Sequence, residues 1–148
     1  MKNIEKYRHV IEEQGLDAIL LTSRVSRMYC AEYDVAEGLA IVTLKGNRYF
    51  TDSRYIEVAE KHLLAFHVYM VDKDHSFMML LKQAVEELGV KKLGFEESFM
   101  TVEEFSNFNQ NLDVELVPCQ QAINKLRHVK DEWEIERMLK AQEITDTT

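Results

Sequence analysis

The sequence predicts an α/β sandwich in which helices flank both faces of a mixed β-sheet. Its second half alternates short strand-like segments with amphipathic segments in the order β-α-β-α-β, which favours parallel strands joined by right-handed crossovers. Its first half contains a hairpin, whose strands are antiparallel, so both strand directions are expected. A chain of 148 residues hides roughly 70% of its unfolded surface on folding, enough for one domain with a real core.

The chain opens with a helical pattern followed by a buried strand. Apolar residues recur at helical spacing from Asn3, a capping residue type, to Gly15, which ends the helix. Residues 17–21 form a short apolar run suited to a buried strand. The periodicity is then weak up to Gly38. We expect a short strand at 28–30 and a loop over 31–37.

A hairpin and a capped helix are expected next. Residues 39–44 and 48–51 have strand character, and Lys45-Gly46-Asn47 between them is typical of a hairpin turn. Asp52 or Ser53 is then placed to cap a helix. In the second half, Ser76 and the pair Thr101 and Glu104 are the helix-start signals. The elements expected there are residues 66–71, 76–88, 93–96, 101–108, 114–117 and 122–126.

Composition excludes several classes of function. The formal net charge is −8, which repels a phosphate backbone, so nucleic-acid binding through a basic face is not expected. No apolar run approaches the roughly 18 residues of a membrane span, and no signal-peptide pattern opens the sequence. The two cysteines, Cys30 and Cys119, do not form a disulfide framework. A cytoplasmic protein is expected.

A search for chemical groups predicts no catalytic residue and no metal site. The five histidines show no ligand spacing, and residues 72–75 are interpreted as a polar loop. Glu96-Glu97 can be read as a paired carboxylate, but we interpret both as strand-end charges that face water. Cys30 is interpreted as a packed thiol. Cys119 begins a helix, where a thiolate can gain from the helix dipole, but no base can be assigned to it.

Two segments remain after this search. Phe50-Thr51-Asp52-Ser53-Arg54-Tyr55 turns a strand into a helix with charged residues at the corner, where Arg54 can pair with Asp52 or with another carboxylate. The loop at 31–37 holds Tyr33 and Asp34. It is either an ordinary connection or a functional loop, because rigid α/β frames often carry function on such loops.

At these segments the sequence resembles the creatinase/prolidase N-terminal domain of Xaa-Pro aminopeptidases and dipeptidases. Four segments match that family in order, the most specific being Phe50–Tyr55. Where the family commonly has Asn-x-x-Tyr-Leu-Thr-Gly-Phe, this sequence reads Ser26-Arg27-Met28-Tyr29-Cys30-Ala31-Glu32-Tyr33 and lacks the Asn and the Gly. The other matching segments are residues 14–22, 93–97 and 126–135.

The resemblance implies an enzyme with a second, catalytic domain of "pita-bread" fold. In the family that domain holds two divalent metals, usually Mn or Co, on two Asp, one His and two Glu. A metal-bound hydroxide there cleaves the peptide bond before proline. None of those ligands can be assigned within this sequence. The resemblance therefore implies that residues 1–128 are a non-catalytic domain with a ribonuclease H-like motif and that the 148-residue chain alone is inactive.

The resemblance also implies partners and site residues. In the family the N-terminal domain supports homodimerisation and lends a loop to the active-site mouth of the neighbouring subunit, which acts on short proline-containing peptides. The residues at matching positions are Tyr33 and Asp34 of the 31–37 loop and Asp52, Arg54 and Tyr55.

Residues 129–148 are expected to form a linker helix that leads into the catalytic domain, because their apolar stripe needs a covering surface. Two alternatives stay open. One is a stand-alone interaction or regulatory module of the same fold. The other is a small thiol enzyme that uses Cys119.

Overall fold

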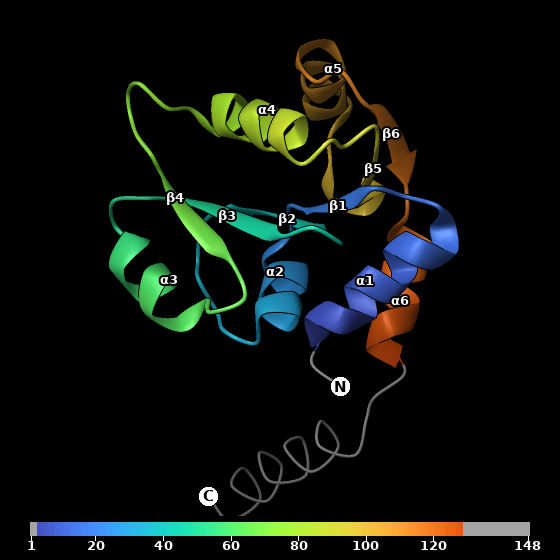
Figure 1. Cartoon of the computed structure of the whole chain (residues 1–148), viewed down its shortest axis with the longest axis horizontal. Coiled ribbons are helices and arrows are strands. Elements are labelled where there is room, and N and C mark those ends of the chain that lie inside the picture. The colour runs from blue at the N-terminus through green and yellow to red at the C-terminus, as the bar shows by residue number, and fades with distance from the viewer. Residues whose placement is uncertain (1–2, 129–148) are drawn as a thin grey trace, which may run out of the picture.

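A computed structural model, which describes residues 3–128, contains one six-stranded sheet between two layers of helices (Figure 1). The strand order is β4-β3-β2-β1-β5-β6. The predicted α/β sandwich is therefore confirmed. The strands are β1 (Ala18–Leu21), β2 (Leu39–Thr43), β3 (Asn47–Asp52), β4 (His67–Val71), β5 (Lys92–Phe95) and β6 (Glu115–Pro118).

The sheet is mixed because one strand runs against the others. β2 pairs antiparallel with both β1 and β3, so β1 and β3 run in the same direction. β4 is parallel to β3, β5 is parallel to β1, and β6 is parallel to β5. β4 and β5 also run in the same direction, but they are not neighbours, because β3, β2 and β1 lie between them.

Each face of the sheet has its own core. Along β1, Ile19 and Leu21 face one cluster, while Ala18 and Leu20 face the other, as the two-residue period of a strand requires. The first cluster is covered by α1 (Asn3–Gln14), α2 (Arg24–Ala31), α3 (Ile56–His62) and α6 (Gln120–His128). The second is covered by α4 (Phe77–Glu87) and α5 (Val102–Asn111). Figure 1 shows these two layers on opposite sides of the sheet.

Several helix ends follow the sequence signals. The Ser76 hydroxyl accepts a hydrogen bond from the N–H of Met79 at the start of α4. Thr101 and Glu104 form the predicted capping box on α5. Gly15, at φ 66°, follows α1 with the left-handed backbone typical of a helix stop.

The strand predicted at 28–30 is wrong, because these residues belong to α2. Ser23 caps this helix by accepting a hydrogen bond from the N–H of Ser26. The buried side of α2 consists of Ser26, Arg27 and Cys30. Two of these three residues are polar, so the helix shows no apolar stripe in the sequence.

The cap predicted at Asp52 or Ser53 is also wrong. Helix α3 begins at Ile56, after Tyr55, and has no side-chain cap. The carboxylate of Asp52 instead accepts a hydrogen bond from the N–H of Arg54, two residues on, which forms a local turn between the strand and the helix.

Two further points concern membrane-spanning helices and the predicted linker helix. Among residues 3–128, no helix is long and apolar enough to cross a bilayer. The linker helix predicted at 129–148 lies outside the described residues and stays a prediction.

Candidate functional site at the carboxyl edge of the sheet

The candidate site lies at one edge of the sheet, where five parallel strands end and β2 begins. The carboxyl ends of parallel strands are where open α/β sheets usually bind ligands. Here that edge carries the turn from β1 into α2, the loop from α2 to β2, and the turn from β3 into α3. All five predicted site residues, Tyr33, Asp34, Asp52, Arg54 and Tyr55, are in these segments.

Asp34 and Tyr33 are both held from outside the loop. Arg24 donates Nε and Nη2 to the two carboxylate oxygens of Asp34 at 2.8 and 2.7 Å. This hydrogen-bonded pairing lowers the pKa of Asp34 from its ordinary value. The ring of Tyr33 stacks on the ring of His62, the last residue of α3, with centroids 4.1 Å apart. Tyr33 is half-buried, so it packs against the domain rather than projecting freely from the loop.

The corner after β3 contains the second arginine pair. Arg54 donates Nη2 to Asp52 at 2.6 Å and Nε to both carboxylate oxygens at 3.2 Å. Its guanidinium also lies over the ring of Tyr55, 5.1 Å from the centroid. The hydrogen bond from Arg54 lowers the pKa of Asp52. The predicted pairing of Arg54 with Asp52 is confirmed.

The two arginine pairs belong to one charged surface. Asp34 raises the pKa of Arg24 and Asp52 raises that of Arg54, each chiefly through its hydrogen bonds. Tyr55 and the carboxylate of Glu37 contribute smaller electrostatic effects to the pKa of both arginines. Both arginines therefore lie within electrostatic range of the same two groups.

A buried arginine of α2 holds the loop between α2 and β2. Arg27 is only 5% exposed, and its Nη1 donates to the carbonyl of Val35 at 2.9 Å and to the hydroxyl of Tyr49 at 2.5 Å. Its Nη2 donates to the carbonyl of Ala36 at 3.4 Å. The loop backbone is therefore attached to the helix at two consecutive residues.

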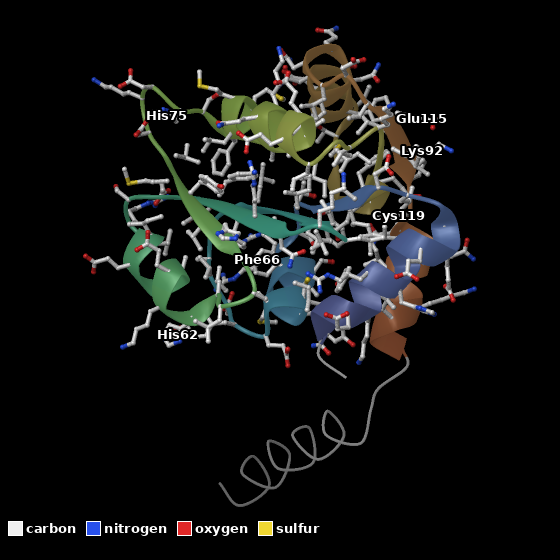
Figure 2. All side chains as sticks on the ribbon, in the orientation of Figure 1. His62, Phe66, His75, Lys92, Glu115 and Cys119 are labelled. Atoms are coloured by element: carbon white, nitrogen blue, oxygen red, sulfur yellow. The ribbon has the colours of Figure 1, made fainter. Side chains whose placement is uncertain are left out.

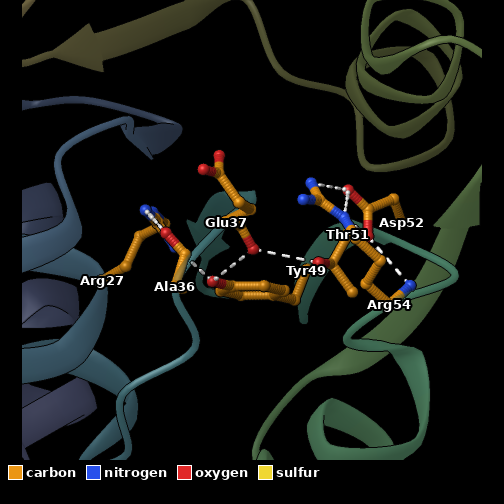
Figure 3. Close-up of polar contacts among 7 residues, drawn as sticks. All are labelled: Arg27, Ala36, Glu37, Tyr49, Thr51, Asp52 and Arg54. Atoms are coloured by element: carbon orange, nitrogen blue, oxygen red, sulfur yellow. Dashed lines mark hydrogen bonds and ion pairs between the residues drawn. The ribbon is translucent and has the colours of Figure 1, made fainter.

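The next carbonyl of the loop is held by β3 (Figure 3). The hydroxyls of Thr51 and Tyr49 donate to the carbonyl of Glu37 at 2.9 and 3.5 Å. Figure 3 shows the Glu37 carboxylate extending away from these contacts. Three successive loop carbonyls are thus fixed, while the side chain of Glu37 stays exposed.

The two ends of this loop have unusual backbone angles. Glu32, at φ 59°, adopts the left-handed conformation at the C-terminal cap of α2. It stands at the Gly position of the family pattern, and glycine adopts this conformation easily. Gly38 has φ 148°, and a Cβ there would lie 2.6 Å from the Tyr49 ring and 2.7 Å from the Phe50 carbonyl oxygen. Glycine is therefore required at that end.

The expectation that Glu96 faces water is wrong, because Glu96 is completely buried. Its Oε1 accepts hydrogen bonds from the N–H groups of Thr22 and Ser23 at 2.9 and 3.1 Å. Its Oε2 accepts from the hydroxyls of Ser23 and Ser26 at 2.9 and 2.6 Å. Glu97 is exposed as expected, and its carboxylate accepts from the N–H of Gln120 at 2.6 Å.

Sequence reasoning missed Arg27 and Glu96 for the same reason. Each is a charged residue at a buried position, where the reading of hydrophobic patterns expects an apolar one. One signal was available for Arg27. Ser23, Ser26, Arg27 and Cys30 follow the i, i+3, i+4, i+7 spacing of a single helix face.

Neither cysteine has the environment of a nucleophile. Burial raises the pKa of the Cys30 thiol far above its ordinary value. Burial, with smaller effects of Glu97 and Glu96, raises the pKa of Cys119 to about 12. Burial thus opposes formation of a thiolate at Cys119, which argues against a thiol enzyme. Among residues 3–128, no group of three His, Cys, Asp or Glu side chains is placed to hold a metal ion.

The mixed sheet, the fixed loop after α2 and the charged corner after β3 describe an α/β domain that presents a loop at its carboxyl edge. The chain belongs to the creatinase/prolidase N-terminal domain family, which matches residues 3–129. The resemblance inferred from the sequence is thereby confirmed.

The relatives are peptidases. The chain is 31% identical over 144 residues to "Uncharacterized peptidase YqhT" of Bacillus subtilis. The matched region covers 97% of this chain and 40% of the relative. It is similar to the Xaa-Pro dipeptidase from Bacillus anthracis, with 32% identity and a TM-score of 0.82, over 92% of this chain and 38% of that one. It also resembles the X-Pro aminopeptidase from Thermotoga maritima, with 27% identity and a TM-score of 0.83, over 92% of this chain and 38% of that one. The chain thus spans about two fifths of the length of these relatives.

Replacement of Glu96 by alanine should strongly destabilise the domain. Glu96→Ala leaves four buried donors without their acceptor, which we expect to lower the free energy of unfolding by about 3 kcal/mol or more. Urea unfolding measures this value. Glu97→Ala is the matched control, because Glu97 is exposed and accepts one hydrogen bond. Equal stability of the two variants would contradict the role assigned to Glu96.

Replacement of Arg27 by methionine should release the loop. Arg27→Met keeps an unbranched apolar stem but removes the hydrogen bonds from Arg27 to Val35 and Ala36, so we expect a loss of about 2–4 kcal/mol of unfolding free energy. The amides of residues 32–38 should also exchange with solvent faster. Arg24→Met, on the exposed side of the same helix, should leave the unfolding free energy nearly unchanged. If loop exchange is as slow in Arg27→Met as in the parent chain, Arg27 does not hold the loop.

Proposed function

We propose that this chain serves as the non-catalytic N-terminal domain of a metal-dependent Xaa-Pro peptidase. In this proposal a separate catalytic domain carries two divalent metals, Mn or Co, and hydrolyses the peptide bond before proline. The present domain supports a homodimer, and its loop at residues 31–38 borders the active-site entrance of the neighbouring subunit. Short proline-containing peptides are the proposed substrates.

Family membership is the observation that carries this proposal. The similar proteins include an Xaa-Pro dipeptidase and an X-Pro aminopeptidase, and this chain matches only about two fifths of each. The lack of a metal-ligand group among residues 3–128 fits a division of labour in which the chemistry belongs to another domain.

The geometry of the loop supports a role in shaping an entrance. A loop that limits the size of a substrate must resist displacement by that substrate. Here Arg27, Tyr49 and Thr51 fix three consecutive carbonyls by hydrogen bonds. The side chains of Asp34 and Glu37 remain exposed. A fixed backbone with exposed charged side chains can contact a peptide without being pushed aside.

The arginine pairs fit a positioning role. Arg24 and Arg54 each engage a carboxylate through two nitrogens, which fixes the planes of their guanidinium groups. Asp52, Arg54 and Tyr55 thereby hold the strand-to-helix corner beside the loop. Their proposed contribution is to keep the entrance in shape rather than to react with the substrate.

A stand-alone interaction module of the same fold is the alternative function. Both proposals contain the domain described here. They differ in whether the same protein also has a catalytic domain. Activity measurements on the chain and on the full product of its reading frame separate them.

The chain alone should not hydrolyse Xaa-Pro dipeptides when Mn²⁺ or Co²⁺ is added. The full product of the reading frame should hydrolyse them, and removal of the metal with a chelator should abolish this activity. Release of free proline measures both. Hydrolysis by the 148-residue chain would contradict the proposal. A full product that binds no metal and cleaves no Xaa-Pro peptide would favour the interaction module.

Substitution in the loop should change the kinetics of the full product without unfolding it. Tyr33→Ala with Asp34→Ala removes the His62 stack and the Arg24 pair, so we expect kcat/KM for Xaa-Pro peptides to change by about tenfold, equivalent to roughly 1.4 kcal/mol. Metal content and the unfolding transition should stay close to those of the parent.

Glu86→Ala, an exposed change at the C-terminal end of α4, which leads to the start of β5 and so to the opposite edge of the sheet, is the control and should leave the kinetics unchanged. Unchanged kinetics of the double variant across several Xaa-Pro substrates would remove the loop from the entrance.

A further inference from the structure

The loop at residues 31–38 is held differently in its two halves. Its second half is attached to buried groups. Val35 is only 3% exposed, and its carbonyl accepts a hydrogen bond from the buried Arg27. The carbonyl of Glu37 accepts one from Thr51, which is also buried. Hydrogen bonds that are shielded from water are stronger, so we expect this half of the loop to be rigid.

The first half, residues 32–34, is held at the surface. Asp34 pairs with Arg24, but the two side chains are 41% and 57% exposed, and exposed ion pairs add little stability. Glu32, which joins this half to α2, is exposed and has a left-handed backbone. The position of residues 32–34 therefore depends chiefly on Tyr33.

Tyr33 is joined to a different element, α3, by its stack on His62. The two rings are nearly parallel, with an interplanar angle of 5° and centroids 4.1 Å apart. Tyr33 also packs against the first core cluster and is half-buried. Stacked aromatic pairs contribute more than the area they bury. The stack is thus the contact through which α3 holds the first half of the loop.

His62 is a firm support for this stack. It is the last residue of α3, and Figure 2 labels it at the end of that helix. Ala59, three residues earlier, is fully buried, and Leu63, directly after it, is 2% exposed. The N–H of Leu63 donates to the carbonyl of Ala59 at 2.8 Å. Because buried residues anchor the backbone on both sides, the exposed ring of His62 is attached to a fixed point.

We propose that His62 is a positioning residue for the loop: its stack holds residues 32–34 against α3 and thereby sets the length of peptide that the loop admits. This inference rests on the proposed function, in which the loop borders an active-site entrance. It adds a residue that lies outside both the loop and the corner at residues 52–55.

The two halves of the loop indicate what release of the stack would do. Residues 32–34 could then move between Glu32 and Val35, while the hydrogen bonds to the carbonyls of residues 35–37 would stay in place. The entrance would widen at one end and keep its shape at the other. An Xaa-Pro dipeptide fits either form and should be affected little. A longer peptide, whose chain extends past the loop, should gain access.

NMR relaxation of the 148-residue chain tests the positioning. In His62→Ala we expect the backbone order parameters of residues 32–34 to fall from about 0.85 to below about 0.6, whereas those of residues 35–37 stay near the parent value. His62→Phe keeps an aromatic ring for the stack and should restore residues 32–34. Lys61→Ala, an exposed change in the same turn of α3, is the control and should leave these order parameters unchanged.

Kinetics of the full product of the reading frame test the selection by length. We expect His62→Ala to raise kcat/KM for a tetrapeptide that begins with Xaa-Pro, relative to the Xaa-Pro dipeptide, by about fivefold or more. His62→Phe should return this ratio to within about twofold of the parent. A loss of stability alone lowers the activity on both peptides alike, so it would not change the ratio.

The positioning role is overturned if residues 32–34 are as ordered in His62→Ala as in the parent, or if Lys61→Ala loosens them equally. The selection by length is overturned if the ratio does not change in His62→Ala, or if His62→Phe fails to restore it. A full product without Xaa-Pro activity would overturn the proposed function and the selection together. The order parameters of the chain would still decide whether His62 holds the loop.

Discussion

The buried carboxylate of Glu96 accepts four hydrogen bonds, two from the backbone N–H groups of Thr22 and Ser23 and two from the hydroxyls of Ser23 and Ser26, where β1 turns into α2. Ser23 and Ser26 are buried, so their donors depend on an acceptor supplied by the residue that follows the neighbouring strand. Because β5 is parallel to β1, Glu96, which directly follows the last residue of β5, lies where that turn begins. The contact between these two strands thus sets the path by which α2 leaves the sheet.

The direction of α2 in turn determines the carboxyl-edge loop. Ser26 faces Glu96, and the next residue, Arg27, reaches the carbonyls of Val35 and Ala36. Tyr49 of β3 joins the same network by accepting from Arg27 and donating to Glu37. A continuous set of hydrogen bonds therefore runs from β5 through α2 and the loop to β3. The shape of the loop is a property of the whole sheet rather than of the loop sequence.

The sequence predicted the frame well because hydrophobic period and capping residues are local signals. The strands, the hairpin and the starts of α4 and α5 were all readable from neighbouring residues, as the Thr101–Glu104 capping box illustrates. The prediction failed at α2 and at Glu96, where polar residues occupy buried positions and find partners up to 74 residues away. No local pattern indicates such a partner. The five site residues came from resemblance, and their contacts required the fold.

The same contacts explain why the Glu96 carboxylate at this edge is not open to a ligand. In open α/β sheets the crevice for a ligand forms where neighbouring connections leave the sheet in opposite directions. Here β1 continues into β2 on one side, and β5 continues into β6 on the other. The side chains of Glu96, Ser23 and Ser26 meet between these two strands and satisfy one another. A carboxylate whose acceptor positions are filled by protein donors has no free position for a substrate or a metal. At this edge, the side chains that remain exposed are therefore those of the fixed loop, such as Asp34 and Glu37.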